Sequence, residues 1–138
     1  MNPLDNGLKN QIIEGMLELW ETSDNWTQGV LARDKDNNEV APEWDSAVSW
    51  CFVGCMQRSL HNLYRQRVLS YDSPFDFCEM SDITEQFMND VARKEKLAIS
   101  VVYFNDNDNR SFEDVRLLVK QMLEEKIEEL YDDDDSEF

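Results

Sequence analysis

Apolar residues recur at helical spacing in several stretches of the chain, separated by polar segments. The first stretch covers residues 7–21, and its apolar side chains are Leu8, Ile12, Ile13, Met16, Leu17 and Trp20. Lys9 and the glutamates at 14, 18 and 21 are assigned to the opposite side. The pattern predicts an amphipathic helix with its apolar stripe turned toward a core. Residues 24–45 follow as a polar loop or hairpin.

A second helix is predicted over residues 44–65, with Asp45 or Ser46 as its N-cap. The run at 50–56 has no polar side for two turns, and a helix that is apolar all round is a buried helix. The core-defining residues of this stretch are Trp50, Cys51, Gly54 and Cys55. Ala47, Cys51, Gly54 and Cys55 also form a stripe of small residues, against which another helix could pack closely.

Two further helices are predicted in the second half of the chain. One starts near Ser81 or Asp82 and turns its apolar residues inward. The other starts at Ser111, with Asp114 three residues later. Between them, residues 97–104 suit a strand by composition. A single strand has no partner in this chain, so a buried extended segment and a helical continuation both stay open.

These patterns predict a mainly α protein, a compact single-domain bundle of about four helices with at most one short extended segment near 97–104. The globular domain is expected to span residues 1–130, followed by a disordered acidic tail at 131–138. The chain has 138 residues, of which 41% are hydrophobic, and this is enough to build one core.

The formal net charge of -17 arises from 30 acidic and 13 basic residues. Such a charge repels nucleic acid and anionic membranes, so neither is expected as a direct partner. A net charge of about 2 to 8 is enough to keep a small domain soluble. The excess therefore favours a surface that binds a basic protein. The predicted partner-binding residues are Glu14, Glu18, Glu21, Glu124, Glu125, Glu128, Glu129, Asp132, Asp133, Asp134 and Asp135.

The basic residues Arg58, Arg65 and Arg67 form an island without acidic residues between positions 46 and 70. We expect them to pair with carboxylates on other helices, and an anchor for a partner's acidic patch is the alternative. Residues 1–15 lack the pattern of a secretory signal, and no apolar run is long enough to span a membrane. Three cysteines, an odd number, are interpreted as reduced thiols, which favours a cytoplasmic location.

No metal, cofactor or catalytic residue is expected. Cys51, Cys55, Cys78 and His61 could supply a zinc set, but helical geometry turns His61 about 120° away from Cys55. The loop starting at Asp34 resembles a calcium loop without its required glycine and glutamate. With one histidine and no glycine-rich phosphate loop, the sequence predicts no enzymatic activity.

Three motifs resemble a family of small bacterial and phage proteins of unknown function. They are a Trp-x-x-Gly turn at 26–29, an Ala-x-x-Trp-Cys-x-x-Gly helix at 47–54, and an aromatic-Asn-Asp loop at 104–106. The resemblance covers about residues 20–123. Cys55 replaces a usual alanine, Phe104 replaces a usual tryptophan, and the acidic tail is long. The resemblance implies a mostly helical domain from a prokaryote or virus and brings no activity with it.

The resemblance also draws attention to Asn105 and Asp106. It implies a structural loop that caps the last helix or bonds the backbone of the turn at 26–29. The alternative is a polar loop site in which Asn105 and Asp106 join Arg33 and Asp34.

The leading functional hypothesis is a non-enzymatic acidic protein, encoded by a phage and acting in the host cytoplasm. It would inhibit or modulate a nucleic-acid-binding host protein, such as a nuclease, defence complex or polymerase, by DNA mimicry. A small ligand-binding or hydrolytic domain using the Asn105–Asp106 loop is one alternative. A virion or assembly component, built on apolar residues at 71, 75 and 77, is another.

Overall fold

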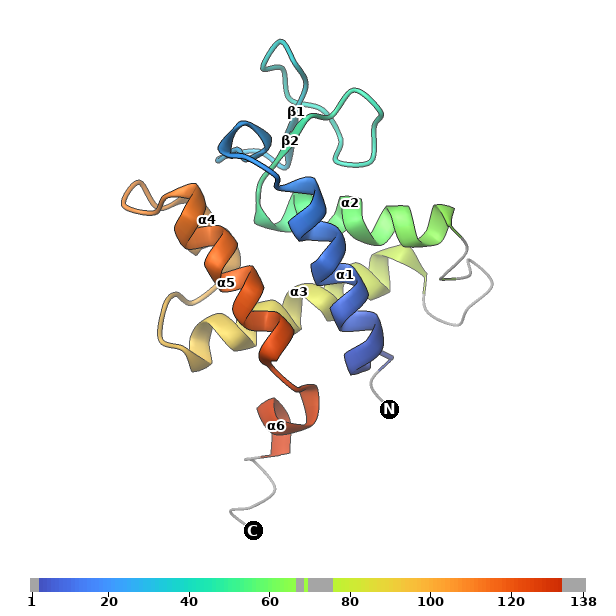
Figure 1. Ribbon diagram of the computed structural model, residues 1–138, viewed down its shortest axis with the longest axis vertical. Coiled ribbons are helices and arrows are strands. Elements are labelled where there is room, and N and C mark those ends of the chain that lie inside the picture. The colour runs from blue at the N-terminus through green and yellow to red at the C-terminus, as the bar shows by residue number, and fades with distance from the viewer. Residues whose placement is uncertain (1–2, 67–68, 70–75, 133–138) are drawn as a thin grey trace.

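The computed structural model describes residues 3–66, 69 and 76–132, and within them the chain is mainly α, as predicted (Figure 1). The elements in chain order are α1 (Asn6–Leu19), the 3-10 helix η1 (Ser23–Asn25), β1 (Ala32–Arg33), β2 (Ser49–Trp50), α2 (Phe52–Arg65), α3 (Phe77–Lys94), α4 (Val101–Asp106), α5 (Phe112–Glu124) and α6 (Ile127–Asp132). The two strands pair antiparallel, with Ala32 opposite Trp50.

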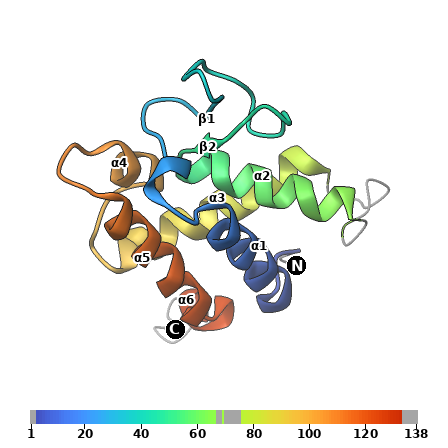
Figure 2. The same cartoon turned by 45° about the horizontal axis from the view of Figure 1, so that its top comes forward.

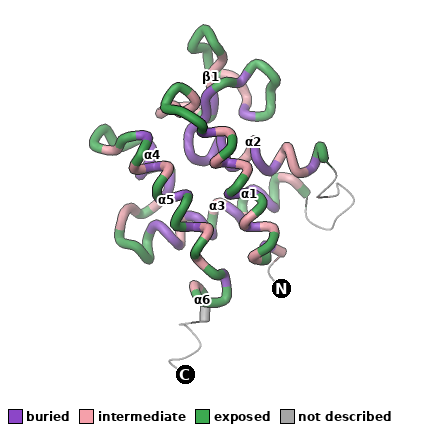
Figure 3. The backbone as a smooth tube through the Cα atoms, viewed as in Figure 1, coloured by how far each residue is buried: buried purple, intermediate pink, exposed green. Residues whose placement is uncertain are grey.

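Helix α1 packs against both α2 and α5, and α3 contacts α2 from the other side (Figures 1 and 2). The buried side of each helix faces this common centre (Figure 3). Trp20, the fully buried C-cap of α1, meets the rings of Phe52 and Phe112 edge-on, at centroid distances of 5.8 Å and 6.2 Å. Burying an aromatic or aliphatic side chain of this size stabilises the fold by about 1.5–3 kcal/mol. The apolar stripe predicted for residues 7–21 therefore joins three helices.

Small side chains let α1 and α2 approach closely. A Cβ atom on Gly15 would overlap Ser59 Oγ. That hydroxyl donates a hydrogen bond of 2.7 Å to the carbonyl of Ile12, and Cys55 Sγ donates to the carbonyl of Met16 at 3.5 Å. Cys55 thus acts as a small buried residue at a helix contact, in line with its predicted role in the core.

The predicted start of the second helix at 44–46 is wrong, because residues 49–50 form strand β2. The helix begins at Phe52, where Cys51 Sγ accepts a hydrogen bond of 3.3 Å from the Gly54 amide and acts as the N-cap. The predicted stripe of small residues does not receive a helix at Gly54. A Cβ atom there would overlap the carbonyl oxygen of Leu31, so the glycine admits the backbone that leads into β1.

The other predictions for the second half of the chain have different outcomes. Helix α3 begins at Phe77 rather than near residue 81, because Asp76 Oδ1 accepts a hydrogen bond of 2.9 Å from the Glu79 amide and caps it. The extended alternative for 97–104 is wrong, since Ser100 caps the short helix α4. The start of the last long helix at Ser111 is confirmed, with the capping box to Asp114 in place.

The C-terminal acidic segment forms a separate helix after a break at Glu125 and Lys126. Helix α6 ends at Asp132, so it extends two residues into the segment predicted as a tail, and residues 133–138 lie outside the described residues. None of the helices in the described part of the chain has both the length and the apolar character needed to cross a lipid bilayer.

Candidate functional site

An acidic groove runs between α1 and α2. Glu14, Glu18 and Glu21 line it, together with amide and hydroxyl side chains of both helices, and its volume is about 540 Å³. The three carboxylates are exposed. Glu14 and Glu18 lie one turn apart on α1, and Glu21 comes two residues after the end of the helix. Among the described residues, none that lines the groove is a lysine, arginine or histidine. The fold therefore brings three of the predicted partner-binding residues into one concave surface.

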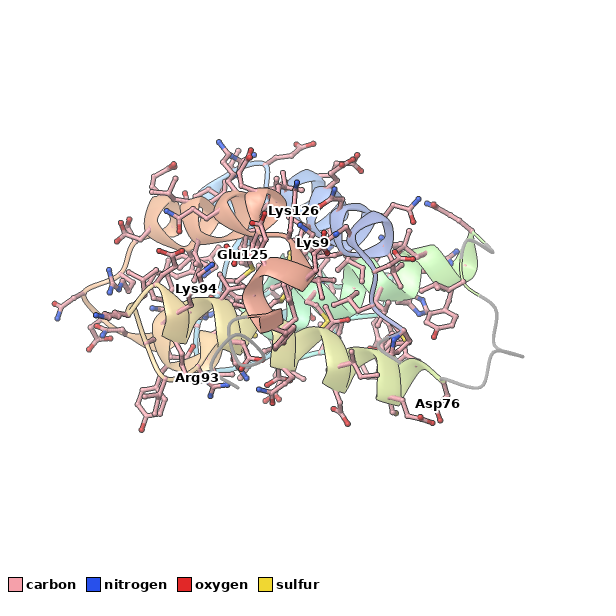
Figure 4. All side chains as sticks on the ribbon, turned by 90° about the horizontal axis from the view of Figure 1, so that it is seen from below. Lys9, Asp76, Arg93, Lys94, Glu125 and Lys126 are labelled. Atoms are coloured by element: carbon pink, nitrogen blue, oxygen red, sulfur yellow. The ribbon has the colours of Figure 1, made fainter. Side chains whose placement is uncertain are left out.

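Most of the remaining predicted acidic residues lie at the end of α5 and on α6, where Lys9 anchors the backbone (Figure 4). Lys9 was predicted on the solvent side of α1, but it is 2% exposed. Its ammonium donates to the carbonyls of Met122, Leu123 and Glu125 at 2.8, 3.1 and 2.5 Å. Burial lowers the pKa of Lys9, against the opposing pull of nearby glutamates. The lysine satisfies carbonyls that the end of α5 leaves open.

Two further contacts hold α6 in place. Asn6 Oδ1 accepts a hydrogen bond of 3.0 Å from the Ile127 amide at the start of α6, and Asn6 Nδ2 donates to Glu128 at 2.8 Å. Tyr131 donates its hydroxyl proton to Asp90 Oδ2 on α3 at 2.6 Å. The acidic helix is therefore attached to both α1 and α3.

The predicted acidic residues of this region are not equally exposed or available to a partner. Glu125 pairs with Lys94 at 2.5 Å and its side chain is only 13% exposed, whereas Glu124 and Glu129 are exposed. Asp133, Asp134 and Asp135 lie outside the described residues.

The three motifs of the family resemblance meet at Asn105, which is 1% exposed. Its Oδ1 accepts hydrogen bonds from Trp26 Nε1 at 2.7 Å and from the Phe52 amide at 3.1 Å. Its Nδ2 donates to the Thr27 carbonyl at 3.1 Å and to Asp106 Oδ1 at 3.0 Å. Two acceptor and two donor positions are a complete set for an amide side chain. Asn105 therefore joins α4, the 26–29 turn and the start of α2, with no capacity left for a ligand.

Asp106 extends this junction toward the surface. Its Oδ1 also accepts a hydrogen bond of 3.0 Å from the Gly29 amide, whose φ of 84° suits glycine. The loop thus bonds the backbone of the 26–29 turn. This is one of the structural roles that the resemblance implies for Asn105 and Asp106.

Arg33 and Asp34, the other members of the predicted polar loop site, are bonded elsewhere. Arg33 Nε donates to Thr27 Oγ1 at 2.8 Å, and Asp34 Oδ1 closes its own turn by accepting from the amides of Asp36 and Asn38. None of the hydrogen bonds found in the described part of the chain joins them directly to Asn105 or Asp106.

A cavity of about 190 Å³ lies beside this junction, between residues 29–31, the start of α2, and α3 and α4. Its walls are mainly apolar, and Cys51, Glu85 and Asp106 contribute polar atoms. Burial raises the pKa of Cys51 to about 11, so the thiol stays protonated at neutral pH. Burial, and then the charge of Asp82, raise the pKa of Glu85.

The zinc candidates are not assembled. Cys51 caps α2, Cys55 bonds α1, and Cys78 is exposed, and all three are free thiols. Burial, with Arg58 and Arg65 nearby, lowers the pKa of His61. Within the residues that the structure describes, no three His, Cys, Asp or Glu side chains gather as metal ligands would.

Two arginines of the island, Arg58 and Arg65, contact different kinds of groups. Arg58 was predicted to meet a carboxylate, but it donates to the carbonyls of Pro42 and Trp44 and lies over the Trp50 ring. Arg65 pairs with exposed Asp45 at 3.8 Å, a weak surface contact. Arg67 lies outside the described residues.

Sequence reasoning missed Lys9 and Glu85. Lys9 lies three and four residues before Ile12 and Ile13, on the buried side of α1, so helical spacing alone could have placed it. For Glu85, no local pattern indicates that it lines a cavity with residues from three other segments.

The fold and junction define a small mainly α protein whose three sequence motifs converge on one buried asparagine. The chain belongs to a family of unknown function (DUF6197), whose family model matches residues 9–125. Comparison with curated proteins and with solved structures found no match.

Proposed function

We propose that this protein is a non-enzymatic binding protein whose acidic surface docks a basic, nucleic-acid-binding protein. The observation that supports the proposal is the groove between α1 and α2, which Glu14, Glu18 and Glu21 line with no cationic side chain among its described lining residues. Three like charges in one groove are unfavourable for the isolated protein, and a cationic partner would relieve them.

The geometry of the acidic surface favours carboxylates at defined spacings over negative charge spread evenly across the protein. Glu14 and Glu18 lie one helical turn apart, which separates them by about 6 Å along the axis of α1. Amides of Gln11, Asn62 and Gln66 line the same groove and supply hydrogen-bonding groups between the charges. Because α1 is packed on both α2 and α5, little ordering is needed on binding.

A second acidic group lies at the end of α5 and on α6. Asn6 attaches helix α6 to the N-terminal end of α1. Lys9 attaches the end of α5 to the same helix. A partner with a long basic cleft could meet both groups. Such an array would compete with DNA for that cleft, and DNA mimicry is the proposed mechanism of inhibition. A phage-encoded inhibitor of a host nuclease, defence complex or polymerase fits this chemistry.

The test begins with affinity capture of a partner from host lysate, followed by binding measurements with the purified partner from 50 to 400 mM NaCl. The affinity should fall steeply with salt, because screening weakens attraction between exposed charges. The protein should also displace a fluorescent DNA duplex from the partner. Affinity that is insensitive to salt, or failure to displace DNA, would contradict the proposal.

Matched variants locate the interface. Glu14→Gln/Glu18→Gln/Glu21→Gln should weaken binding at least tenfold. Asp36→Asn/Glu95→Gln/Asp108→Asn removes the same charge from exposed positions elsewhere and should have a much smaller effect. Glu124→Gln/Glu129→Gln tests the second acidic group. Equal losses in the first two variants would show that net charge, rather than the groove, governs association.

A further inference from the structure

The cavity beside Asn105 differs from the acidic groove in its chemistry. Its walls come from Val30, Leu31, Phe52, Val53 and Val102, and two carboxylate residues, Glu85 and Asp106, line it as well. Helix α4, which carries Asp106, contacts both α2 and α3 (Figure 2). The cavity therefore combines an apolar lining with negative charge, contributed by four separate segments of the chain.

One of the two carboxylates is held in a fixed orientation. Asp106 Oδ1 accepts hydrogen bonds of 3.0 Å from both the Gly29 amide and Asn105 Nδ2. Both bonds use the same oxygen, so the second oxygen of Asp106 keeps its capacity to accept. Such preorganisation lowers the cost of binding a donor there.

Among the residues that the structure describes, no lysine, arginine or histidine lines the cavity to offset its negative charge. The ion pairs found among the described residues join Arg65 to Asp45, Arg93 to Asp90 and Lys94 to Glu125, so none of them involves Glu85 or Asp106. Glu85 is half-buried, and its raised pKa reflects a carboxylate that burial and the charge of Asp82 disfavour.

We propose that this cavity binds a cation carried on a short aliphatic chain, with the chemistry of an arginine or lysine side chain. The methylene groups would contact the apolar walls, as the stems of these residues do on protein surfaces. The guanidinium or ammonium head would bond Asp106 and Glu85. This inference is independent of the acidic groove between α1 and α2.

The size of the cavity suits such a ligand. Its volume of about 190 Å³ is well above the roughly 10–15 Å³ that one water molecule needs. A lysine or arginine side chain has five or seven non-hydrogen atoms beyond its Cα. A bare divalent cation fits less well, because Ca²⁺ and Mg²⁺ need six or more oxygen ligands and most of this lining is apolar.

The experiment is a titration of the full-length protein followed by amide NMR, with n-butylguanidinium and N-acetylarginine amide as probes. Saturable shifts are expected at Gly29, Leu31 and Val102. N-acetylcitrulline amide, which is neutral and similar in shape, should produce none at the same concentrations. Guanidinium without a chain should bind at least tenfold more weakly than n-butylguanidinium. Binding of both probes supports a side chain of a partner as the ligand, and binding of n-butylguanidinium alone supports a free small molecule.

Substitutions of the two carboxylates test the proposal directly. Glu85→Gln removes a charge from a side chain that makes no hydrogen bond within the described part of the chain, so the fold should persist and probe affinity should fall at least fivefold. Asp106→Asn keeps an oxygen to accept from Gly29 and should cause a similar loss. Glu95→Gln, at an exposed position just after α3, is the control and should leave affinity unchanged. Absence of saturable shifts, equal shifts with the citrulline probe, or an unaltered affinity in Glu85→Gln would overturn the proposal.

Discussion

The indole nitrogen of Trp26 donates a hydrogen bond of 2.7 Å to the side-chain oxygen of Asn105, which lies 79 residues later in the chain. The same oxygen accepts from the Phe52 amide, at the first residue of α2. One buried amide side chain therefore connects the loop after α1, the start of α2 and the end of α4. The three motifs of the resemblance, although distant in sequence, each supply one part of this junction.

Substitution of Asn105 by alanine should strongly destabilise the protein. The change leaves Trp26 Nε1, the Phe52 amide and the Thr27 carbonyl without partners, and each unsatisfied buried group costs about 1–3 kcal/mol, so a total loss of about 3 kcal/mol or more is expected. Urea denaturation measures the free energy of unfolding. Asn109→Ala, at an exposed position of the next loop, is the matched control and should have little effect. Equal stability of the two variants would contradict the structural role of Asn105.

Gly54→Ala should also destabilise the fold, because its Cβ would overlap the Leu31 carbonyl and push β1 away from α2. Overpacking of this kind costs about 1–3 kcal/mol. In Gly7→Ala the new Cβ lies 3.5 Å from Asp5 Oδ1, an ordinary contact, so stability should be unchanged or rise by about 0.5 kcal/mol. Thermal unfolding of the two variants makes the comparison. A stable Gly54→Ala variant would mean that the backbone of residue 31 is not held against α2.

The thiols should react at very different rates. Cys78 is exposed, whereas Cys51 and Cys55 are buried, and burial raises the pKa of both buried thiols. Since the thiolate is the reactive form, a disulfide reagent at pH 8 should label one thiol quickly and the other two only after unfolding. Cys78→Ser should abolish the fast phase. Rapid labelling of all three native thiols would show that α1 and α2 separate readily.

Lys9 should make stability depend on pH in the alkaline range. Its folded-state pKa lies below the ordinary value of 10.5, so the unfolded chain holds the proton more tightly. The free energy of unfolding contributed by Lys9 should therefore increase as pH rises from the folded pKa toward 10.5. Urea denaturation of the native protein and of Lys9→Met across this range isolates the effect, because other groups titrate alike in both. An unchanged difference between the two proteins would show that the Lys9 pKa is not lowered.

Tyr131→Phe should loosen α6 without unfolding the rest. The change removes the hydrogen bond to Asp90 and should cost about 1 kcal/mol of local stability. Limited proteolysis should then cleave the segment after residue 124 faster than in the native protein. Tyr103→Phe alters a tyrosine that is 67% exposed and serves as the control. If both variants are cleaved alike, Asp90 does not anchor α6.

Residues with a periodic pattern were the ones that sequence reasoning placed correctly. The apolar face of α5 and its Ser111 cap depend on neighbours three and four residues away, and both are confirmed. The predicted start of α2 was wrong. The observed start depends on the pairing of Trp50 with Ala32 and on the Cys51 cap, and a local pattern reveals neither. Asn105 was singled out by a motif, but its four partners belong to segments that only folding brings together.

The sequence by itself determined a mainly α domain with a strongly acidic surface, because helical periodicity and net charge are local or additive properties of the chain. The tertiary structure decided where that chemistry is concentrated. It turned Lys9 inward onto the end of α5, gathered Glu14, Glu18 and Glu21 in one groove, and placed Glu85 and Asp106 at one apolar cavity. Those arrangements follow from the packing of segments far apart in sequence, where burial and hydrogen-bond satisfaction select one juxtaposition among many.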